Sequence, residues 1–143
     1  MRPGVLGAHS GAMSAHPNVT TVNSMTQAIF GQDKDALARI FTDDYTFHLR
    51  GPGDWSGDHD GVAGFLGAIG RIMEATNGDV HLDQQFCIGA DGWAAEFEHA
   101  TLGRNGQKLE SKNAFVYRFD GDRIAEMWMF IGVLPEQVGS FFD

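Results

Sequence analysis

Residues 113–128 read NAFVYRFDGDRIAEMW, the pattern of two strands joined by a tight turn. Gly121 and Asp122 suit a two-residue hairpin turn, which needs positive φ at its central positions. Counting outward from this turn sets the register of the two strands. The predicted pairs are Asp120–Arg123, Phe119–Ile124, Tyr117–Glu126, Phe115–Trp128 and Asn113–Phe130. The stretch therefore predicts the last hairpin of an antiparallel sheet.

The preceding strands meet at a second turn, Arg104-Asn105-Gly106, which suits a three-residue loop with glycine in the left-handed position. It joins a strand over residues 93–102 to one that starts at Leu109. The predicted pairs are Thr101–Leu109, His99–Ser111, Phe97–Asn113 and Ala95–Phe115. Glu98 then stands opposite Lys112, and such a pair of opposite charges supports the register.

In this register one face of the sheet combines aromatic and polar side chains. Its members are Phe97, Phe115, Tyr117, Trp128 and Phe130 with His99, Ser111, Asn113 and Glu126. Polar groups that converge on an apolar surface are typical of a small-molecule pocket. A carboxyl group among aromatic rings has its pKa raised by desolvation, which suits proton transfer near neutral pH. We therefore expect Glu126, His99 and Asn113 to be catalytic.

A structural role is the alternative for these polar residues. Glu126 would then be solvated at the end of the sheet or accept a hydrogen bond from Tyr117, and His99 would be an ordinary core histidine. The opposite face of the sheet is also apolar. Its members are Ala94, Ala114, Val116, Met127 and Met129. A small domain with a sheet apolar on both sides predicts a homodimer through the outer face.

The composition narrows the class of protein. The chain has 143 residues, enough for one domain with a sizeable core. Ten Lys and Arg against nineteen Asp and Glu give a net charge of -9, which repels phosphates, so no nucleic-acid partner is expected. The single cysteine, Cys87, excludes an intramolecular disulfide and fits a reducing compartment. Without an apolar run of ~20 residues or a signal peptide, we expect no membrane partner and a cytoplasmic protein.

The chain divides into a tail and one domain. Residues 1–17 lack an apolar period and predict a disordered tail, and residues 18–143 predict a single domain. Helical spacing of apolar residues predicts helices over residues 19–30, 33–41 and 62–73. Alternation predicts strands over residues 45–49, 81–88, 93–102 and 109–131, the last of these a hairpin. Asn18 is the predicted N-cap of the first helix.

Two further patterns bear on ligands. Gly61, Gly64, Gly67 and Gly70 recur every third residue of the third helix, which fits close packing on the sheet or room for a ligand. The acidic loop from Asp54 to Asp60 matches no calcium loop, so no metal is expected. No glycine-rich phosphate loop follows a strand, so no cofactor is expected either.

Four stretches resemble the SnoaL-like polyketide cyclases of the nuclear transport factor 2 superfamily. They are residues 41–45 (FTDDY), 47–53 (FHLRGPG), 57–62 (GDHDGV) and 113–128. The resemblance covers the chain from about Val19 onward. It implies an α+β fold in which a curved antiparallel sheet forms a cone-shaped barrel wrapped around three N-terminal helices. In such proteins a catalytic acid sits on the inner wall, and Glu126 is its positional match.

The resemblance also implies a pocket and an activity. The residues expected to bind substrate are Tyr45, Phe47, Leu49, Phe65, Phe97, Ser111, Phe115, Tyr117 and Trp128. The implied activity is ring formation in an apolar, polyketide-like natural-product intermediate, by acid/base-assisted closure or by conformational templating of a cycloaddition. Asn113, with Tyr117 or Ser111, would hold a carbonyl oxygen. Isomerases, dehydratases and non-catalytic binding proteins share this fold and stay open as alternatives.

Overall fold

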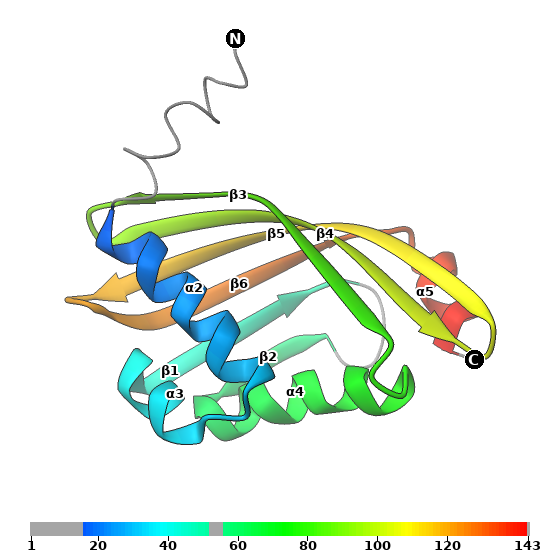
Figure 1. Cartoon of the computed structure of the whole chain (residues 1–143), viewed down its shortest axis with the longest axis horizontal. Coiled ribbons are helices and arrows are strands. Elements are labelled where there is room, and N and C mark those ends of the chain that lie inside the picture. Colours follow the sequence, from blue (N-terminus) through cyan, green and yellow to red (C-terminus); the bar gives the residue numbers. More distant parts are fainter. Residues whose placement is uncertain (1–15, 52–55, 143) are drawn as a thin grey trace, which may run out of the picture.

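A curved six-stranded sheet arches over the helices of the N-terminal half (Figure 1). The computed structural model describes residues 16–51 and 56–142. The helices are α2 (Pro17–Phe30), α3 (Lys34–Ile40), α4 (Gly61–Ala75) and α5 (Pro135–Phe142). The strands are β1 (Phe41–Arg50), β2 (Gly57–Asp60), β3 (Val80–Ala90), β4 (Trp93–Arg104), β5 (Gln107–Asp120) and β6 (Arg123–Gly132). Within the described ranges, no helix has the length and apolar character needed to cross a membrane.

The sheet has the strand order β2-β1-β6-β5-β4-β3 and is open, with β2 and β3 as its edges. The α+β class and the packing of a curved sheet on N-terminal helices are confirmed. One pair of strands differs from the antiparallel expectation, because β1 runs parallel to β6. Several elements separate these two strands in the chain, so no hairpin fixes their relative direction.

Helix α2 lies on the concave side of the sheet and is tied to the turn between β3 and β4. Its apolar stripe is buried, as Val22 shows with 0% exposure. The N-cap is His16, whose Nδ1 accepts a hydrogen bond from the backbone N–H of Asn18 at 3.1 Å. The predicted capping role of Asn18 is wrong, because its buried Nδ2 donates to the carbonyl oxygens of Ala90 and Trp93. The predicted tail lies outside the described residues up to position 15.

The core is centred on aromatic residues of β1 that alternate with polar ones. Phe41 and Tyr45 stack with ring centroids 4.0 Å apart. Phe65 of α4 packs edge-on against this row, with its centroid 5.0 Å from that of Phe47. Because successive side chains of a strand face opposite sides, Phe47 and Leu49 point to the helices while His48 points to the outer face.

Two short elements were not predicted from the sequence. Strand β2 falls in the stretch interpreted as a loop and pairs with the second half of β1. Helix α5 follows the last strand and buries Val138 and Phe141 against Leu109 of β5. Arg104 holds the end of α5 by donating from Nη1 to the carbonyl oxygen of Phe141 at 2.9 Å.

The glycines of the α4 repeat differ in how closely other residues pack against them. A Cβ atom at Gly64 would lie 3.2 Å from the carbonyl carbon of His59, so this glycine permits close packing. Cβ atoms at Gly67 and Gly70 would meet nothing within 4 Å. These two positions are exposed and weaken the helix without a packing reason.

Replacing Gly67 or Gly70 with Ala should raise the free energy of unfolding by about 1 kcal/mol each, because Ala loses less backbone entropy in a helix. Urea denaturation of G67A and G70A measures this. The matched control is G64A, in which the crowding against His59 should cancel part or all of the gain. A G64A variant that gains as much as G67A would contradict this account of the repeat.

Candidate active site

The turn between β4 and β5 decides which side chains of these strands face the helices. It contains two residues, Asn105 and Gly106, both with positive φ (54° and 78°), as a type I′ turn requires. Arg104 therefore pairs with Gln107 instead of belonging to a three-residue loop. The predicted register is wrong by one residue, and the observed pairs are Glu98–Asn113, His99–Lys112 and Ala100–Ser111.

The hairpin of β5 and β6 begins as predicted and then shifts. Asp120 pairs with Arg123 and Phe119 with Ile124, but a bulge at Ala125 follows. Beyond the bulge the pairs are Arg118–Glu126, Tyr117–Met127, Val116–Trp128, Phe115–Met129, Ala114–Phe130 and Asn113–Ile131. The extra residue turns every later side chain of β6 to the opposite face.

These two shifts correct the predicted pocket. Five residues expected beside Asn113 face the outer side instead, namely Phe97, His99, Glu126, Trp128 and Phe130. Three residues expected on the outer face, Ala94, Met127 and Met129, face the helices instead. The remaining residues of the predicted pocket are buried on the helix side of the sheet or in α4, namely Tyr45, Phe47, Leu49, Phe65, Ser111, Asn113, Phe115 and Tyr117. The inward and outward faces of the last strands were thus partly exchanged in the prediction.

The inner face of the sheet carries a group of hydrogen-bonded side chains that are buried except for Gln84, which is exposed. We call it the inner polar cluster, and its members are Gln84, Glu96, Glu98, Ser111, Asn113 and Tyr117. One half is a chain of donors that ends on a carboxyl group. The hydroxyl of Ser111 donates to Oδ1 of Asn113, and Nδ2 of Asn113 donates to Oε2 of Glu98 at 3.0 Å.

The other half of the inner polar cluster surrounds Glu96. The Tyr117 hydroxyl donates to Oε1 of Glu96 at 2.6 Å, and Nε2 of Gln84 donates to Oε2 at 2.6 Å. Glu96 and Glu98 are each only 7% exposed. Burial of an acidic group costs free energy unless hydrogen-bond donors satisfy its oxygens. The hydrogen bonds to Glu96 and Glu98 therefore offset part of the cost of burying these two side chains.

The two acids differ in how fully they are satisfied. Both oxygens of Glu96 accept hydrogen bonds, whereas Glu98 accepts one, from Asn113. Burial raises the pKa of Glu98 to about 7, the hydrogen bond from Asn113 lowers it in part, and the charge of Glu96 adds to the rise. Glu98 thus exists in both protonation states near neutral pH, which is the property that a proton-transferring group needs.

A small apolar cavity of about 40 Å³ lies at the Ser111 end of the inner polar cluster. It is lined by Ile72, Leu102, Leu109, Ser111, Asn113, Met129, Ile131 and Val138. The lining therefore comes from α4, α5 and three strands, with two polar side chains among apolar ones. An apolar hollow with a few convergent polar groups is the usual form of a small-molecule site.

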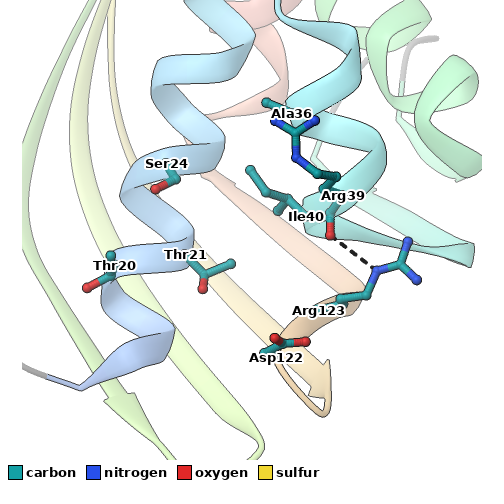
Figure 2. A pocket seen from close by; sticks show the side chains of 8 residues that line it. All are labelled: Thr20, Thr21, Ser24, Ala36, Arg39, Ile40, Asp122 and Arg123. Atoms are coloured by element: carbon teal, nitrogen blue, oxygen red, sulfur yellow. Dashed lines mark hydrogen bonds between the residues drawn. The ribbon is translucent and has the colours of Figure 1, made fainter.

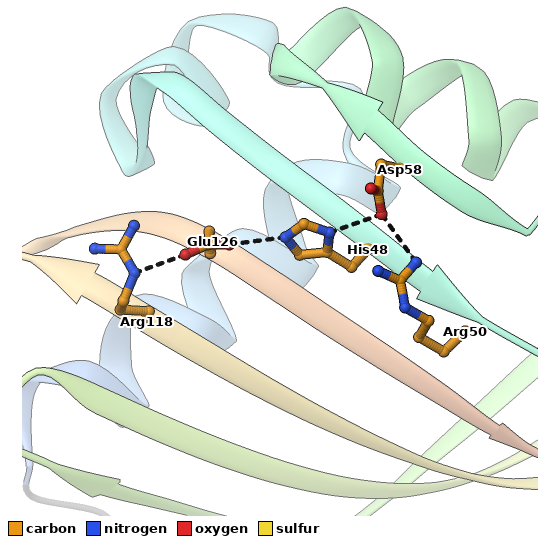
Figure 3. Close-up of polar contacts among 5 residues, drawn as sticks. All are labelled: His48, Arg50, Asp58, Arg118 and Glu126. Atoms are coloured by element: carbon orange, nitrogen blue, oxygen red, sulfur yellow. Dashed lines mark hydrogen bonds and ion pairs between the residues drawn. The ribbon is translucent and has the colours of Figure 1, made fainter.

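Glu126, the expected catalytic acid, belongs to a different group on the outer face (Figure 3). We call it the outer ion cluster, and its members are Arg50, Asp58, His48, Glu126 and Arg118. Each of its four contacts is 2.8 Å long, from Arg50 to Asp58, from Asp58 to His48, from His48 to Glu126 and from Glu126 to Arg118. His48 also stacks on Trp128, with centroids 5.1 Å apart.

The hydrogen bonds of the outer ion cluster favour the charged forms of Glu126 and His48. A hydrogen bond from Arg118, and then one from His48, holds the pKa of Glu126 below its usual value. Burial lowers the pKa of His48, but the hydrogen bonds to Asp58 and Glu126 raise it more, so the net shift is upward. Glu126 is thus a fixed negative charge at neutral pH. Its side chain lies on the outer face of the sheet, away from the cavity.

An open groove of about 490 Å³ lies between α2, α3 and the turn of the last hairpin (Figure 2). It is lined by Thr20, Thr21, Ser24, Ala36, Arg39, Ile40, Asp122 and Arg123. Arg123 donates to the carbonyl oxygens of Arg39 and Ala38, so its guanidinium holds the end of α3. None of these lining residues belongs to the inner polar cluster. We therefore place the candidate site at the cavity, not at the groove.

The acidic loop does not form a metal centre in the described part of the chain. No group of three or more His, Cys, Asp or Glu is placed there to hold an ion. Asp58 is engaged by His48 and Arg50, and Asp54 lies outside the described residues. In the inner polar cluster only the two carboxyl groups would be strong metal ligands, because the other side chains are amides and hydroxyls.

Comparison with known proteins places the fold. Residues 22–127 match the SnoaL-like domain family. Bal32a, from a soil-derived mobile gene cassette, is 20% identical with a TM-score of 0.77, over 89% of this chain and 97% of that one. A Xanthomonas campestris protein of unknown function with a cystatin-like fold is 24% identical with a TM-score of 0.73, over 87% and 97%. IdmH from Streptomyces antibioticus, a candidate polyketide cyclase, is 18% identical with a TM-score of 0.68, over 87% and 99%. No curated protein matches the sequence.

The raised pKa of Glu98 should make stability depend on pH. The folded protein holds this proton up to about pH 7, whereas an unfolded chain releases it near 4.5, so the free energy of unfolding falls as pH rises across this interval. E98Q should lose this dependence and be more stable than the unsubstituted protein at pH 8, by up to about 3 kcal/mol. Urea denaturation at a series of pH values measures the difference.

The control for this measurement is E126Q, for which the opposite sign is expected. The pKa of Glu126 is lowered, so its charge stabilises the folded state above the usual glutamate pKa. E126Q should therefore be less stable than the unsubstituted protein at neutral pH. An E98Q variant with an unchanged pH slope would refute the assignment of the buried proton to Glu98.

Proposed function

Because the chain belongs to the SnoaL-like domain family of the nuclear transport factor 2 superfamily, we propose that it is a cofactor-independent enzyme of the cyclase or isomerase type. In this proposal it moves a proton on an apolar, polyketide-like small molecule, and Glu98 is the catalytic residue. The similarity in fold to IdmH, itself a candidate polyketide cyclase, supports this class of reaction.

One observation carries the proposal, the incomplete satisfaction of a buried acid whose hydrogen-bond donor, Asn113, lines an apolar cavity. Among the residues that the structure describes, Glu98 accepts one hydrogen bond on Oε2 and none on Oε1. Among the described residues, every side-chain oxygen without accessible surface has a hydrogen-bond partner. Oε1 of Glu98 has no such partner, so this atom keeps some accessible surface. A carboxyl group with one oxygen fixed and the other accessible is oriented to exchange a proton with a ligand.

The geometry gives the neighbouring residues separate tasks. Glu98, as carboxylate, accepts a proton from a carbon next to a substrate carbonyl. Asn113 uses one N–H to hold Glu98 and keeps a second N–H for the carbonyl oxygen, which becomes an enolate oxygen. Ser111 fixes the orientation of the amide through Oδ1. The enolate carbon then attacks a second carbonyl of the same molecule, and the proton on Glu98 passes to the new alkoxide, which completes an aldol-type ring closure.

The cavity limits what enters without a change of structure. Its volume of about 40 Å³ is far below the roughly 300–1,000 Å³ of typical ligand pockets. A polyketide-sized substrate would have to displace Val138 of α5 or Ile72 of α4, which form its apolar walls. In the templating alternative, this wall alone would fold the substrate, and no residue would exchange a proton.

A deuterium-exchange assay tests the proposed chemistry. Alkyl 1,3-diketones are incubated with the protein in D2O, and deuterium at the carbon between the carbonyls is followed by mass spectrometry. E98Q should lower the protein-catalysed exchange by roughly 10²–10⁴-fold, the usual contribution of a general base. E126Q removes the same group from the outer face and should leave the exchange near its original rate. Equal exchange by E98Q and the unsubstituted protein would exclude the proton-transfer role and leave the templating or binding alternatives.

We also propose that a second copy of the chain covers the outer face of the sheet. Four large apolar side chains on this face are exposed to between 37% and 46%, namely Phe86, Ile88, Trp93 and Phe130. We call them the outer apolar patch. The outer ion cluster beside it contains both cations and anions, so this face is balanced locally although the net charge is -9. A patch with both signs and apolar area is self-complementary, as a two-fold interface requires.

Sedimentation velocity at micromolar concentration measures the oligomeric state. The unsubstituted protein should sediment as two chains, and F130E should sediment as one, because each interface would bury two new charges. F30E is the matched control, since Phe30 is 52% exposed at the end of α2 and lies outside the outer apolar patch. A single-chain species for the unsubstituted protein would contradict the dimer.

A further inference from the structure

Glu96 is a second buried acid that the proposed chemistry does not use. Its exposure is 7%, and both of its oxygens accept hydrogen bonds of 2.6 Å, from Tyr117 and from Gln84. Gln84 is held in turn by Asn23 of α2, whose Oδ1 lies 3.1 Å from its Nε2. Short contacts from two donors are typical of a carboxylate in its charged form.

The charge of Glu96 is not neutralised by its partners. Tyr117 and Gln84 are both uncharged donors, in contrast to Arg118 and His48, which hold Glu126 on the outer face. Hydrogen bonds from neutral groups stabilise a carboxylate but leave its net charge in place. The field of that charge therefore reaches its neighbours through a buried region, where screening by water is weak.

Glu98 is the other buried acid, and the charge of Glu96 reaches it. The two acids are two residues apart on β4 and face the same side, which places them about 7 Å apart along the strand. Gln84 links the positions, because it donates to Glu96 and also stands opposite Glu98 in the β3–β4 pairing.

We propose that Glu96 is a positioning residue for the proton-transfer site, whose fixed negative charge favours the protonated form of Glu98 and so makes Glu98 a stronger proton acceptor. The inference rests on the proposed function only for its catalytic consequence. The electrostatic coupling itself stands on the burial, the hydrogen bonds and the shared face of the two residues.

The other titratable groups around Glu98 do not supply a competing charge. On the inner face these are Tyr117 of β5, Tyr45 of β1 and Cys87 of β3, which is paired with Glu96. Burial raises the pKa of Cys87 to about 12 and the pKa of both tyrosines well above 10, so all three are neutral at pH 7. Asn113 and Gln84, the residues paired with Glu98 on either side, do not titrate.

A titration of the Glu98 carboxyl carbon by NMR, with 13C-labelled glutamate and no substrate, tests the coupling. The Glu98 signal is identified by its absence from the spectrum of E98Q. In E96Q the midpoint should move down from about 7 toward the usual glutamate value, because the repelling charge is gone. E110Q removes an exposed carboxylate from β5 and should leave the midpoint unchanged.

A charge-swap variant keeps the test decisive if E96Q fails to fold. The double variant E96Q/Q84E retains an amide–carboxylate pair and moves the negative charge to the β3 position opposite Glu98. Its Glu98 midpoint should lie below that of the unsubstituted protein but above the usual glutamate value, because Gln84 is exposed and water screens a charge there more than at position 96. An unchanged midpoint in E96Q, or a midpoint in the swap variant equal to or above that of the unsubstituted protein, would overturn the proposal.

The exchange assay separates this inference from the proposed function. In E96Q the rise of the exchange rate with pH should begin at lower pH, and its plateau should be lower because a weaker base accepts the proton. A mere loss of structure would lower the plateau without moving the rise. If the Glu98 midpoint follows the charge at position 96 but no variant catalyses exchange, the proposed function fails while the coupling stands.

Discussion

The register between β4 and β5, set by the type I′ turn at Asn105–Gly106, determines the chemistry of both faces of the sheet. In a strand, neighbouring side chains point in opposite directions, so the turn length decides which set of β4 faces the helices. With two residues in the turn, Glu96 and Glu98 face inward next to Ser111 and Asn113. The inner polar cluster follows from this count, while the cavity and the outer apolar patch also depend on the bulge at Ala125, which sets the facing of Met129, Phe130 and Ile131.

Acids are accommodated in two physically different ways on the two faces. On the outer face, Glu126 and Asp58 are paired with Arg118, His48 and Arg50, and the pKa of each acid is lowered. On the inner face, amides and hydroxyls supply the hydrogen bonds but no positive charge. The same residue type is therefore a fixed anion at Glu126, which Arg118 and His48 hold, and a titrating group at Glu98, which burial desolvates and no cation pairs with.

The sequence was sufficient for α2, α3 and α4 and for much of the core, but not for α5 or for the site. Apolar spacing located α2, and alternation placed Phe47 and Leu49 inward, because both signals depend on burial of several side chains at once. The register of two paired strands depends on smaller differences in free energy. The supposed pair of Glu98 and Lys112 is worth only about 0.2–1 kcal/mol, which the turn geometry and inward burial outweigh. The Asn-Gly dipeptide was the available signal for a two-residue turn, and it would have revealed Glu98 and Glu96. The bulge at Ala125 has no comparable signal in the residues themselves.

The cavity and Glu98 are connected through Asn113, which lines the cavity and donates a hydrogen bond to Glu98. Val138 and Phe141 of α5 pack against Leu109 at the end where Ser111 and the cavity lie. Desolvation is the largest cause of the raised pKa of Glu98, so water entering there would return the carboxyl group toward its ordinary acidity. In the proposed function, an apolar ligand in the cavity preserves this desolvation, whereas a polar one does not. The proposal of an apolar ligand is thus supported by the titration of the acid as well as by the lining of the cavity.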